Sequence, residues 1–205
     1  MSPAHQLPQE HRPERLPASA GPVLLGLARS IISEALGQTA ALLPPDVNWL
    51  REPAASFVTL NQRDALRGCI GSLSAHRPLA EDIRANALAA AFHDPRFPPL
   101  NAAEWLAVQV EVSVLSPLER LAAQSEVDLI ARIQPGRHGL VLCYGAHQGT
   151  FLPQVWEALP EPREFLRQLK RKAGLPPDFW SLEIEVYCYH VQKWCEPQPP
   201  AGEAT

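Results

Sequence analysis

The apolar positions of this chain follow helical spacing in three segments. Over 23–36, 78–92 and 161–173, apolar residues recur every three or four positions, which predicts three amphipathic helices. Gly37 and Gly174 follow the first and third segments, where glycine is typical of a helix end. The second segment is rich in alanine, so we expect it to pack closely against a sheet.

Other segments alternate between apolar and polar residues, as strands do. Every second residue from Val108 to Val114 is a valine, which places four valines on one buried face of a strand over 108–115. A one-residue shift would expose all four, so we expect the register of this strand to be tightly fixed. Further strands are predicted over 57–60, 65–70, 138–144, 149–152 and 182–190.

These elements predict an α+β fold with a mainly antiparallel or mixed sheet flanked by helices. Between them, Asn101 and Glu104 form a capping-box pattern that predicts a short helix. The ends of the chain, 1–20 and 193–205, contain several prolines and no periodic apolar pattern, so we expect them to be disordered. The remaining residues, 21–192, contain no obvious linker and are predicted to form the folded domain.

Composition and charge indicate a globular protein outside the membrane. Of the 205 residues, 46% are hydrophobic and 20% charged, and no apolar run approaches the roughly 18 residues of a membrane span. The first residues lack the apolar stretch of a secretion signal, so we expect a cytoplasmic protein. The net charge of −4 makes nucleic-acid binding the weakest interpretation, supported only by basic residues between Arg163 and Lys172. The four cysteines contain no CxxC pair and are expected to be free thiols.

The segment 66–71, LRGCIG, is the strongest candidate for a functional site. Gly68 and Gly71 surround Cys69 in a predicted strand, and glycine weakens a strand unless a bend or a close approach requires it. Arg67 precedes them, and a nearby cation favours the reactive thiolate form of cysteine. The alternative is a small buried Cys69, with Arg67 as a surface pairing partner. Glycine on both sides of the cysteine favours the open site.

Five further residues are candidates, each with a structural alternative. Asp94 and Arg96 lie in a proline-rich loop, where they could bind a ligand, or cap a turn and hydrogen-bond to carbonyls. His138, at the start of a strand, suits a general base or an anion donor, or it is a turn residue. Gln154 could anchor a ligand or the backbone, and Lys172 could serve a site or complement its own helix dipole. For Asp94, Gln154 and Lys172 we favour the structural role.

Several chemistries lack their sequence signatures. HExxH and paired CxxC motifs are absent, so the scattered Cys69, His93, Asp94 and His138 do not predict a metal site. GxGxxG, GxxxxGK[ST] and GxSxG are absent as well, which argues against dinucleotide, P-loop and serine-hydrolase chemistry. We therefore expect neither a metal nor a cofactor.

Six further segments form one pattern in order along the chain: LRGCIGSL (66–73), AAFHDPRFPPL (90–100), VEVSVLSPLERL (110–121), GRHGLVL (136–142), GTFLPQVW (149–156) and FLRQLKRKAGLP (165–176). Together they resemble the AMMECR family, and in its bacterial branch the chain is similar to the A components of AmmeMemoRadiSam systems. The resemblance implies an α/β protein of two subdomains, with a cleft between them that LRGCIG lines. It also implies a Memo-type protein and a radical SAM enzyme as partners, without supplying a reaction.

Two residues depart from the pattern of the family. Asp64 stands in a hairpin turn where the family often has glycine, and aspartate tolerates the positive φ that such a turn requires. Lys170 stands where the family often has cysteine, so Cys69, if functional, works without a partner thiol. Helical spacing places Lys170 toward solvent together with Arg163 and Arg167.

Two hypotheses for the function follow. In the first, Cys69 and Arg67 form an active or anion-binding centre that acts with a radical SAM partner on a small molecule or a macromolecule. In the second, the same segment shapes the docking groove of a non-catalytic adaptor, because the chain contains no complete catalytic constellation. The sequence does not identify the substrate, and it does not determine whether the chain forms a homo-oligomer.

Overall fold

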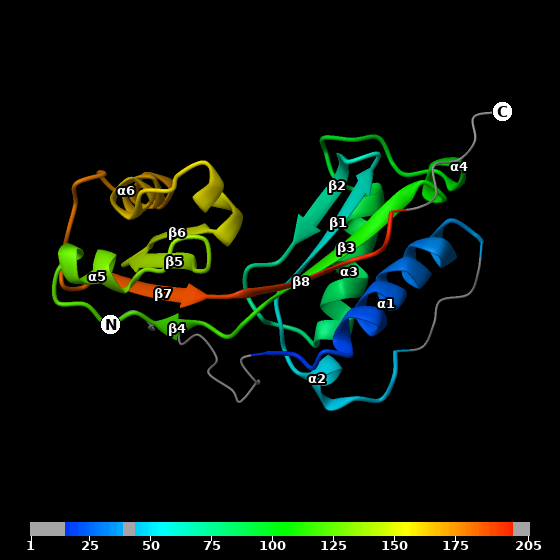
Figure 1. Ribbon diagram of the computed structural model, residues 1–205, viewed down its shortest axis with the longest axis horizontal. Helices are drawn as coiled ribbons and strands as arrows, with labels where there is room; N and C mark the ends of the chain where they lie inside the picture. The colour runs from blue at the N-terminus through cyan, green and yellow to red at the C-terminus, as the bar shows by residue number, and fades with distance from the viewer. Residues whose placement is uncertain (1–14, 39–43, 199–205) are drawn as a thin grey trace. The chain divides into compact units, whose positions relative to one another are not determined.

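The computed structural model describes residues 15–38 and 44–198, and the chain forms two compact units (Figure 1). Of the described residues, unit 1 contains 117–191, and unit 2 contains the preceding ones together with 192–198. Each unit combines an antiparallel sheet with helices, which confirms the predicted α+β class. The chain passes between the units at residues 116–117 and 191–192, so no long linker marks the boundary.

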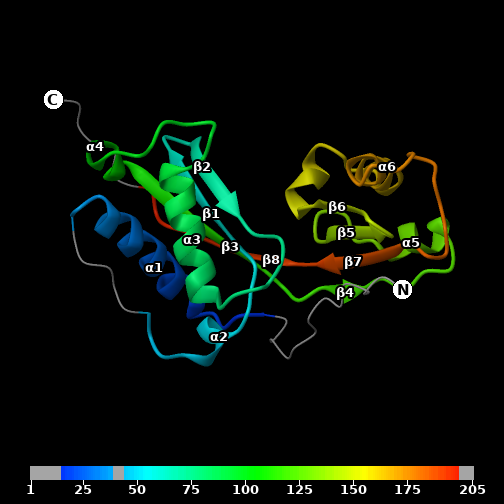
Figure 2. The same cartoon turned by 180° about the vertical axis from the view of Figure 1, so that it is seen from behind.

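Unit 2 is a four-stranded sheet with two long helices on one face (Figures 1 and 2). The strand order is β2-β1-β3-β8, so β2, which carries LRGCIG, is an edge strand. Helices α1 and α3 pack against each other and against the sheet. The elements are α1 Ala20–Ala35, α2 Asn48–Arg51, β1 Ser56–Gln62, β2 Ala65–Gly71, α3 Leu79–Phe92, α4 Ala102–Trp105, β3 Val108–Leu115 and β8 Val191–Cys195.

The core of unit 2 confirms the predicted valine face of β3. All four valines from Val108 to Val114 are buried, and they pack with residues of α1 and α3 such as Leu24 and Ile83. The antiparallel pairing of β1 with β3 sets Leu60 opposite Val110, so apolar residues of both strands face the same helices. Burial of one face in this way excludes a one-residue shift of the register.

Unit 1 is a second four-stranded sheet, in the order β4-β7-β5-β6, with all neighbouring strands antiparallel. Its core contains apolar residues of α6 such as Phe165 and Leu169, together with Leu140, Leu142 and Trp156. The predicted helix end at residue 174 is confirmed by its positive φ of 78°. The elements are β4 Glu119–Arg120, α5 Glu126–Arg132, β5 Gly139–Tyr144, β6 His147–Phe151, the 3₁₀ helix η1 Pro153–Glu157, α6 Pro162–Lys172 and β7 Glu185–Tyr189.

The predicted exposure of Lys170 is wrong. Its side chain is 0% exposed, and its Nζ donates to Glu126 Oε2 at 2.8 Å and to the Pro177 carbonyl oxygen at 3.3 Å. Lys170 lies next to Leu169 and four residues after Leu166, both buried, so the inward face of α6 is wider than the apolar residues alone indicate. The neighbouring α5 supplies the carboxylate that makes this burial tolerable.

Both ends of the described chain belong to the fold of unit 2. The backbone N–H of Leu16 donates to Gln192 Oε1 at 2.6 Å, and Glu196 accepts hydrogen bonds from Arg29. The prediction began a tail at residue 193, whereas β8 runs to Cys195. The outermost parts of the predicted disordered ends, 1–14 and 199–205, lie outside the described residues. None of the helices in the described residues combines the length and apolar character needed to cross a membrane.

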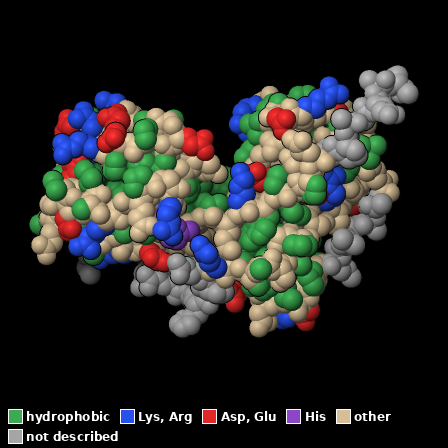
Figure 3. Space-filling model, in the orientation of Figure 1, with side chains coloured by type: hydrophobic (Ala, Val, Ile, Leu, Met, Phe, Trp, Pro, Cys, Tyr) green, Lys and Arg blue, Asp and Glu red, His purple; other side chains and the backbone are tan. Residues whose placement is uncertain are grey.

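The basic residues of α6 lie within a surface of mixed charge. Arg167 pairs with Glu164 at 3.7 Å and with Asp178 at 3.0 Å. On the face shown in Figure 3, Lys and Arg side chains are interspersed with Asp and Glu. Neighbouring opposite charges cancel much of the field that a polyanion would require.

Candidate functional site

The LRGCIG strand enters the sheet from a tight two-residue turn. Arg63 and Asp64, between β1 and β2, have φ values of 50° and 63°. This left-handed pair is typical of a type I′ hairpin turn, which fits the twist of the two strands. Aspartate at position 64 therefore adopts the positive φ that the turn requires, as the sequence analysis expected.

The two glycines around Cys69 are required by packing. A Cβ at Gly68 would lie 2.2 Å from the carbonyl oxygen of Ala90 in α3, and a Cβ at Gly71 would lie 2.2 Å from the Phe57 ring. Neither distance is tolerable, since nonbonded carbon contacts are favourable only near 3.5–4 Å. The interpretation that the glycines open access to the thiol is therefore corrected: they allow β2 to approach α3 and Phe57.

The thiol of Cys69 nevertheless lies outside the hydrophobic core. Gly68 faces α3, so the alternation of a strand points Cys69 to the opposite face of the sheet, which we call the outer face. Cys69 is half-buried there, opposite Thr59 of β1, whose hydroxyl donates to the sulfur at 3.2 Å. Neither of the two sequence interpretations applies in full, because the glycines serve packing while the thiol remains partly exposed.

Arg67 is buried and turned toward α4. It is the extra residue of a β-bulge, because Leu60 pairs with Gly68 and the next residue of β1 pairs with Leu66. Its Nη2 donates to Glu104 Oε2 and to the Pro98 carbonyl oxygen, each at 3.0 Å. Hydrogen bonding to this guanidinium lowers the pKa of Glu104. Nη1 is buried without a hydrogen-bond partner among the described residues.

Asp94 and Arg96 clamp the peptide of Cys69 along the free edge of β2. The Cys69 N–H donates to Asp94 Oδ2 at 2.9 Å, and Arg96 Nη2 donates to the Cys69 carbonyl oxygen at 3.2 Å. The two side chains are also joined to each other, through Arg96 Nε at 2.9 Å and Nη2 at 2.7 Å. They occupy the backbone groups that a further strand would otherwise use. Both structural alternatives are therefore present: Asp94 Oδ1 accepts from the Arg96 N–H at 3.1 Å, as a turn cap does, and Arg96 donates to a carbonyl oxygen, which belongs to the candidate cysteine itself.

The clamp formed by Asp94 and Arg96 predicts that the stability of unit 2 depends on pH. Hydrogen bonds from Arg96, more than any other influence, hold the pKa of Asp94 well below its usual range. A carboxyl with a lowered folded-state pKa stabilises the protein above its unfolded-state value of about 3.9, and that stability is lost as the pH falls through the folded-state pKa. We therefore expect Asp94→Asn to destabilise unit 2 at about pH 6, and to destabilise it less at about pH 3, because the difference from wild type shrinks as the pH falls below about 3.9.

Denaturant unfolding at both pH values checks this expectation. Asp46→Asn is the matched control, because the Asp46 side chain is 85% exposed. A difference between Asp94→Asn and wild type that stayed constant with pH would contradict it.

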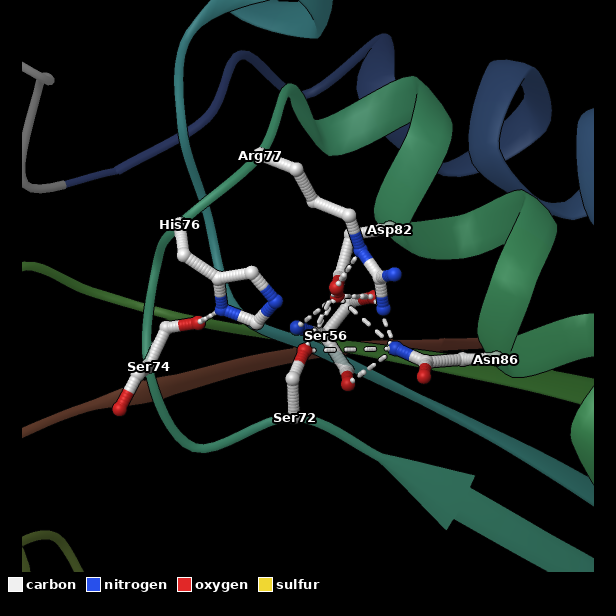
Figure 4. Close-up of polar contacts among 7 residues, drawn as sticks. All are labelled: Ser56, Ser72, Ser74, His76, Arg77, Asp82 and Asn86. Carbon is white, nitrogen blue, oxygen red and sulfur yellow. Dashed lines mark hydrogen bonds and ion pairs between the residues drawn. The ribbon is translucent and has the colours of Figure 1, made fainter.

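A second polar cluster, which the sequence analysis missed, lies just beyond the C-terminal end of β2, around Ser72 (Figure 4). Asp82 of α3 is 0% exposed, and its Oδ2 accepts from the Ser56 N–H at 2.8 Å, the Ser56 hydroxyl at 2.6 Å and Asn86 Nδ2 at 2.9 Å. Ser72 Oγ donates to the same carboxylate at 2.7 Å, and Arg77 Nε donates to Oδ1 at 2.8 Å. This carboxylate therefore joins the start of β1, the residue after β2 and the first turn of α3.

A signal for this cluster was present in the sequence. Asp82 and Asn86 are four residues apart, next to Leu79, Ile83 and Ala87 of the predicted buried stripe. Residues four apart lie on the same face of a helix. The face that carries Asp82 and Asn86 is therefore next to the apolar stripe, at the border of the core. The apolar pattern alone does not distinguish a buried, hydrogen-bonded Asp82 from an Asp82 that is exposed to solvent.

The other predicted site residues lie in unit 1. His138 is buried, its Nδ1 accepts from the Gln134 N–H at 3.2 Å, and burial lowers its pKa, so it is built as a turn residue. Gln154 is exposed in η1. Lys172, in the last turn of α6, lies 4.9 Å from the Phe151 ring centroid, so it makes a cation–π contact as well as the expected dipole interaction. Among the described residues, no three His, Cys, Asp or Glu side chains are grouped to hold a metal ion.

Comparison with known proteins agrees with the motifs. The AMMECR1 family model matches residues 25–194. Protein MK0488 of Methanopyrus kandleri is 38% identical, with 91% of this chain and 93% of that protein covered. A protein of Methanothermobacter thermautotrophicus is 40% identical, with coverage of 84% and 92%.

The fold has a solved counterpart as well. The crystal structure of the uncharacterized protein PH0010 from Pyrococcus horikoshii superposes with a TM-score of 0.73 at 37% identity, covering 88% of this chain and 93% of that one. The family model covers most of the chain, and the relatives match it over nearly their full length. The chain therefore belongs to the AMMECR1 family.

Proposed function

We propose that this chain is the A component of an AmmeMemoRadiSam system, acting with a Memo-type protein and a radical SAM enzyme, and that Cys69 is its reactive group. The partners follow from the resemblance of the motifs. The observation that supports the thiol is the position of Cys69, half-buried on the outer face of unit 2 with the Thr59 hydroxyl donating to its sulfur. A partly exposed thiol can be reached by a substrate, and the hydrogen bond from Thr59 holds its sulfur in one orientation.

The other three cysteines are poorly suited to this role. Burial is the main factor that raises the pKa of Cys143, of Cys188, where it reaches about 11, and of Cys195. Nearby carboxylates add to the effect, Glu185 for Cys143 and Glu111 for Cys195. Cys195 is nevertheless exposed, so it separates accessibility from intrinsic reactivity.

The test is competitive alkylation of the full chain. At about pH 7, limiting iodoacetamide is expected to label Cys69 several times faster than each of the other cysteines, because only the thiolate displaces iodide. Mass spectrometry of the digested protein gives the four rates. Labelling of Cys195 as fast as Cys69 would contradict the proposal, since exposure alone would then explain reactivity.

Replacement of Cys69 by alanine gives a second readout in the same test. We expect Cys69→Ala to lose less than about 1 kcal/mol of unfolding free energy, because the sulfur lies outside the core, and to fail to complement a deletion strain. Cys188→Ala is the matched control: Cys188 is buried in the core of unit 1, so this variant is expected to lose stability but keep function. A Cys69→Ala variant that complements fully but melts earlier would leave Cys69 with a structural role only.

A non-catalytic adaptor is the second candidate, and one observation favours it. The charged groups nearest Cys69 in sequence and space already have partners within the chain, Arg67 with Glu104 and Arg96 with Asp94. An adaptor would use this rigid edge as a docking surface. In that case Cys69→Ala would still co-purify with the Memo-type and radical SAM proteins and would complement the deletion.

A further inference from the structure

We infer that His138 and His190 form an acid-sensitive catch in unit 1, which holds the turn 134–138 closed at neutral pH and releases it when His138 takes up a proton. The catch lies in unit 1 and does not involve Cys69, so it is independent of the proposed function. Its parts are a buried imidazole, a second histidine ring beside it and the backbone of the turn.

The ring of His138 accepts a hydrogen bond that only the neutral imidazole can accept. His138 is 5% exposed, and the backbone N–H of Gln134 donates to its Nδ1 at 3.2 Å. A backbone N–H is always the donor, so Nδ1 carries no proton and the neutral ring has its proton on Nε2. The imidazolium form has a proton on both nitrogens. Protonation of His138 therefore brings two donors together and breaks the bond to Gln134.

This hydrogen bond closes a short turn between α5 and β5. The Gln134 carbonyl oxygen accepts from the N–H groups of Arg137 at 3.2 Å and His138 at 3.0 Å, and Gly136 has a φ of 76°. The His138 ring binds the N–H of the same Gln134, so both backbone groups of that residue are held by the end of the turn. Trp156 Nε1 donates to the His138 carbonyl oxygen at 2.7 Å, which joins the turn to η1. Loss of the imidazole acceptor therefore frees the start of the turn while its end stays attached to η1.

A second histidine makes the charged form of His138 less favourable still. The ring centroid of His190 lies 5.2 Å from that of His138, with the ring planes at 61°. Two imidazolium rings at this distance repel each other, and the repulsion is stronger inside a protein than in water. His190 directly precedes residues 191–192, where the chain passes into unit 2, so the catch lies next to this crossing in the sequence.

The surroundings of the ring determine the direction of the pH effect. Burial is the main factor that lowers the pKa of His138, and the charges of His190 and Arg137 add to it. A histidine with a lowered folded-state pKa stabilises the closed turn above its ordinary value of about 6.5, and this stabilisation is lost as the pH falls. Acid therefore favours the open turn, in which the ring is free to take up a proton. The titratable or charged groups on the elements around the ring are Arg137 on the turn, Tyr189 and His190 at the end of β7, Glu157 on η1 and Arg132 at the end of α5.

The test is hydrogen exchange of the Gln134 backbone N–H, followed by NMR on the full chain at about pH 7 and about pH 5. We expect the opening equilibrium of this amide, corrected for the intrinsic exchange rate, to increase roughly tenfold at the lower pH. The reason is that proton uptake by a freed histidine grows about tenfold per pH unit below its ordinary pKa. Amides of β5, which is paired with β6 and β7, are the internal reference and are expected to stay protected.

The variant His138→Asn separates the charge of the ring from its role as an acceptor. An asparagine Oδ1 can accept from the Gln134 N–H and takes up no proton in this pH range, so the amide is expected to stay protected at both pH values. His190→Phe keeps a ring without a charge and is expected to reduce the increase, because the closed His138 is then protonated more readily. His147→Asn is the matched control and is expected to behave as wild type. His147 is exposed on β6 of the same unit, and asparagine can replace its contact with the Ala173 carbonyl oxygen.

An increase at low pH that His138→Asn abolishes supports the inference. A Gln134 amide that opens equally at both pH values in wild type, or an increase that persists in His138→Asn, would overturn it. Loss of protection in β5 together with the turn would overturn it as well, because unit 1 would then unfold as a whole. If His138→Asn fails to fold, the nitrogen chemical shifts of the wild-type His138 ring decide instead. Nδ1 must be unprotonated at about pH 7 and must gain its proton over the pH range in which the Gln134 amide opens.

Discussion

Replacing Asp82 by alanine is expected to lower the free energy of unfolding of unit 2 by about 3–5 kcal/mol, the range seen when one partner of a buried charged network is removed. The carboxylate accepts hydrogen bonds from Ser56, Ser72, Arg77 and Asn86. Without it, the Ser56 N–H and the Asn86 amide stay buried with fewer acceptors, and an unsatisfied buried donor costs about 1–3 kcal/mol.

The measurement must report each unit separately, because a protein of two units need not unfold in one transition. Hydrogen exchange followed by mass spectrometry does so, since peptides from β1 and α3 report unit 2 while peptides from β5 and α6 report unit 1. Asp46→Ala is the matched control: its exposed ion pair with Arg51 is expected to contribute less than about 1 kcal/mol. If Asp82→Ala and Asp46→Ala lowered the free energy of unfolding equally, the buried Asp82 carboxylate would contribute no more than an exposed ion pair.

Replacing Glu126 by alanine is expected to destabilise unit 1 by about 3 kcal/mol, more than replacing Lys170 itself by methionine. The asymmetry follows from burial, because the Lys170 side chain is 0% exposed and that of Glu126 is 25% exposed. Loss of Glu126 leaves a buried ammonium group with only the Pro177 carbonyl oxygen as acceptor at 3.3 Å. Loss of the lysine leaves a carboxylate that water can reach, and methionine fills much of the volume.

The same exchange experiment tests this pair, now read from the peptides of unit 1. Arg167→Met is the control, since Arg167 lies on the same helix but its pairs with Glu164 and Asp178 are partly exposed. We expect it to change the unfolding free energy by less than about 1 kcal/mol. A larger loss for Lys170→Met than for Glu126→Ala would contradict the expected order.

Local patterns were sufficient for most of the helices and strands. The alternating valines of β3, the apolar stripes of α1 and α3, and the glycine at 174 that ends α6 each depend on neighbours within one or two turns. The capping box at Asn101 and Glu104 forms as its spacing predicts, with asparagine in the place of serine. Such features are governed by backbone geometry and by the burial of one face, both of which act over short separations in the chain.

The candidate site was only partly predictable. The sequence singled out β2, but it assigned the glycines to access, whereas Gly68 is required by a carbonyl oxygen of α3, on another element. It chose Arg67 as the cation near Cys69, although the β-bulge turns that side chain toward α4. Residues two apart in a regular strand share a face, but the bulge at Arg67 interrupts the alternation between Arg67 and Cys69, so closeness in sequence does not place this cation beside the thiol.

The sequence alone determined the α+β class, the buried face of β3, the hairpin turn at Asp64 and the family to which the chain belongs. Only the tertiary structure decided which polar groups are buried and what they bind. Lys170 meets a carboxylate 44 residues earlier in the chain, Asp82 meets a serine 26 residues away, and Cys69 is held by an aspartate 25 residues later. A buried charge is tolerable only where a partner is brought to it, and that partner comes from the packing of distant elements, which no local pattern contains.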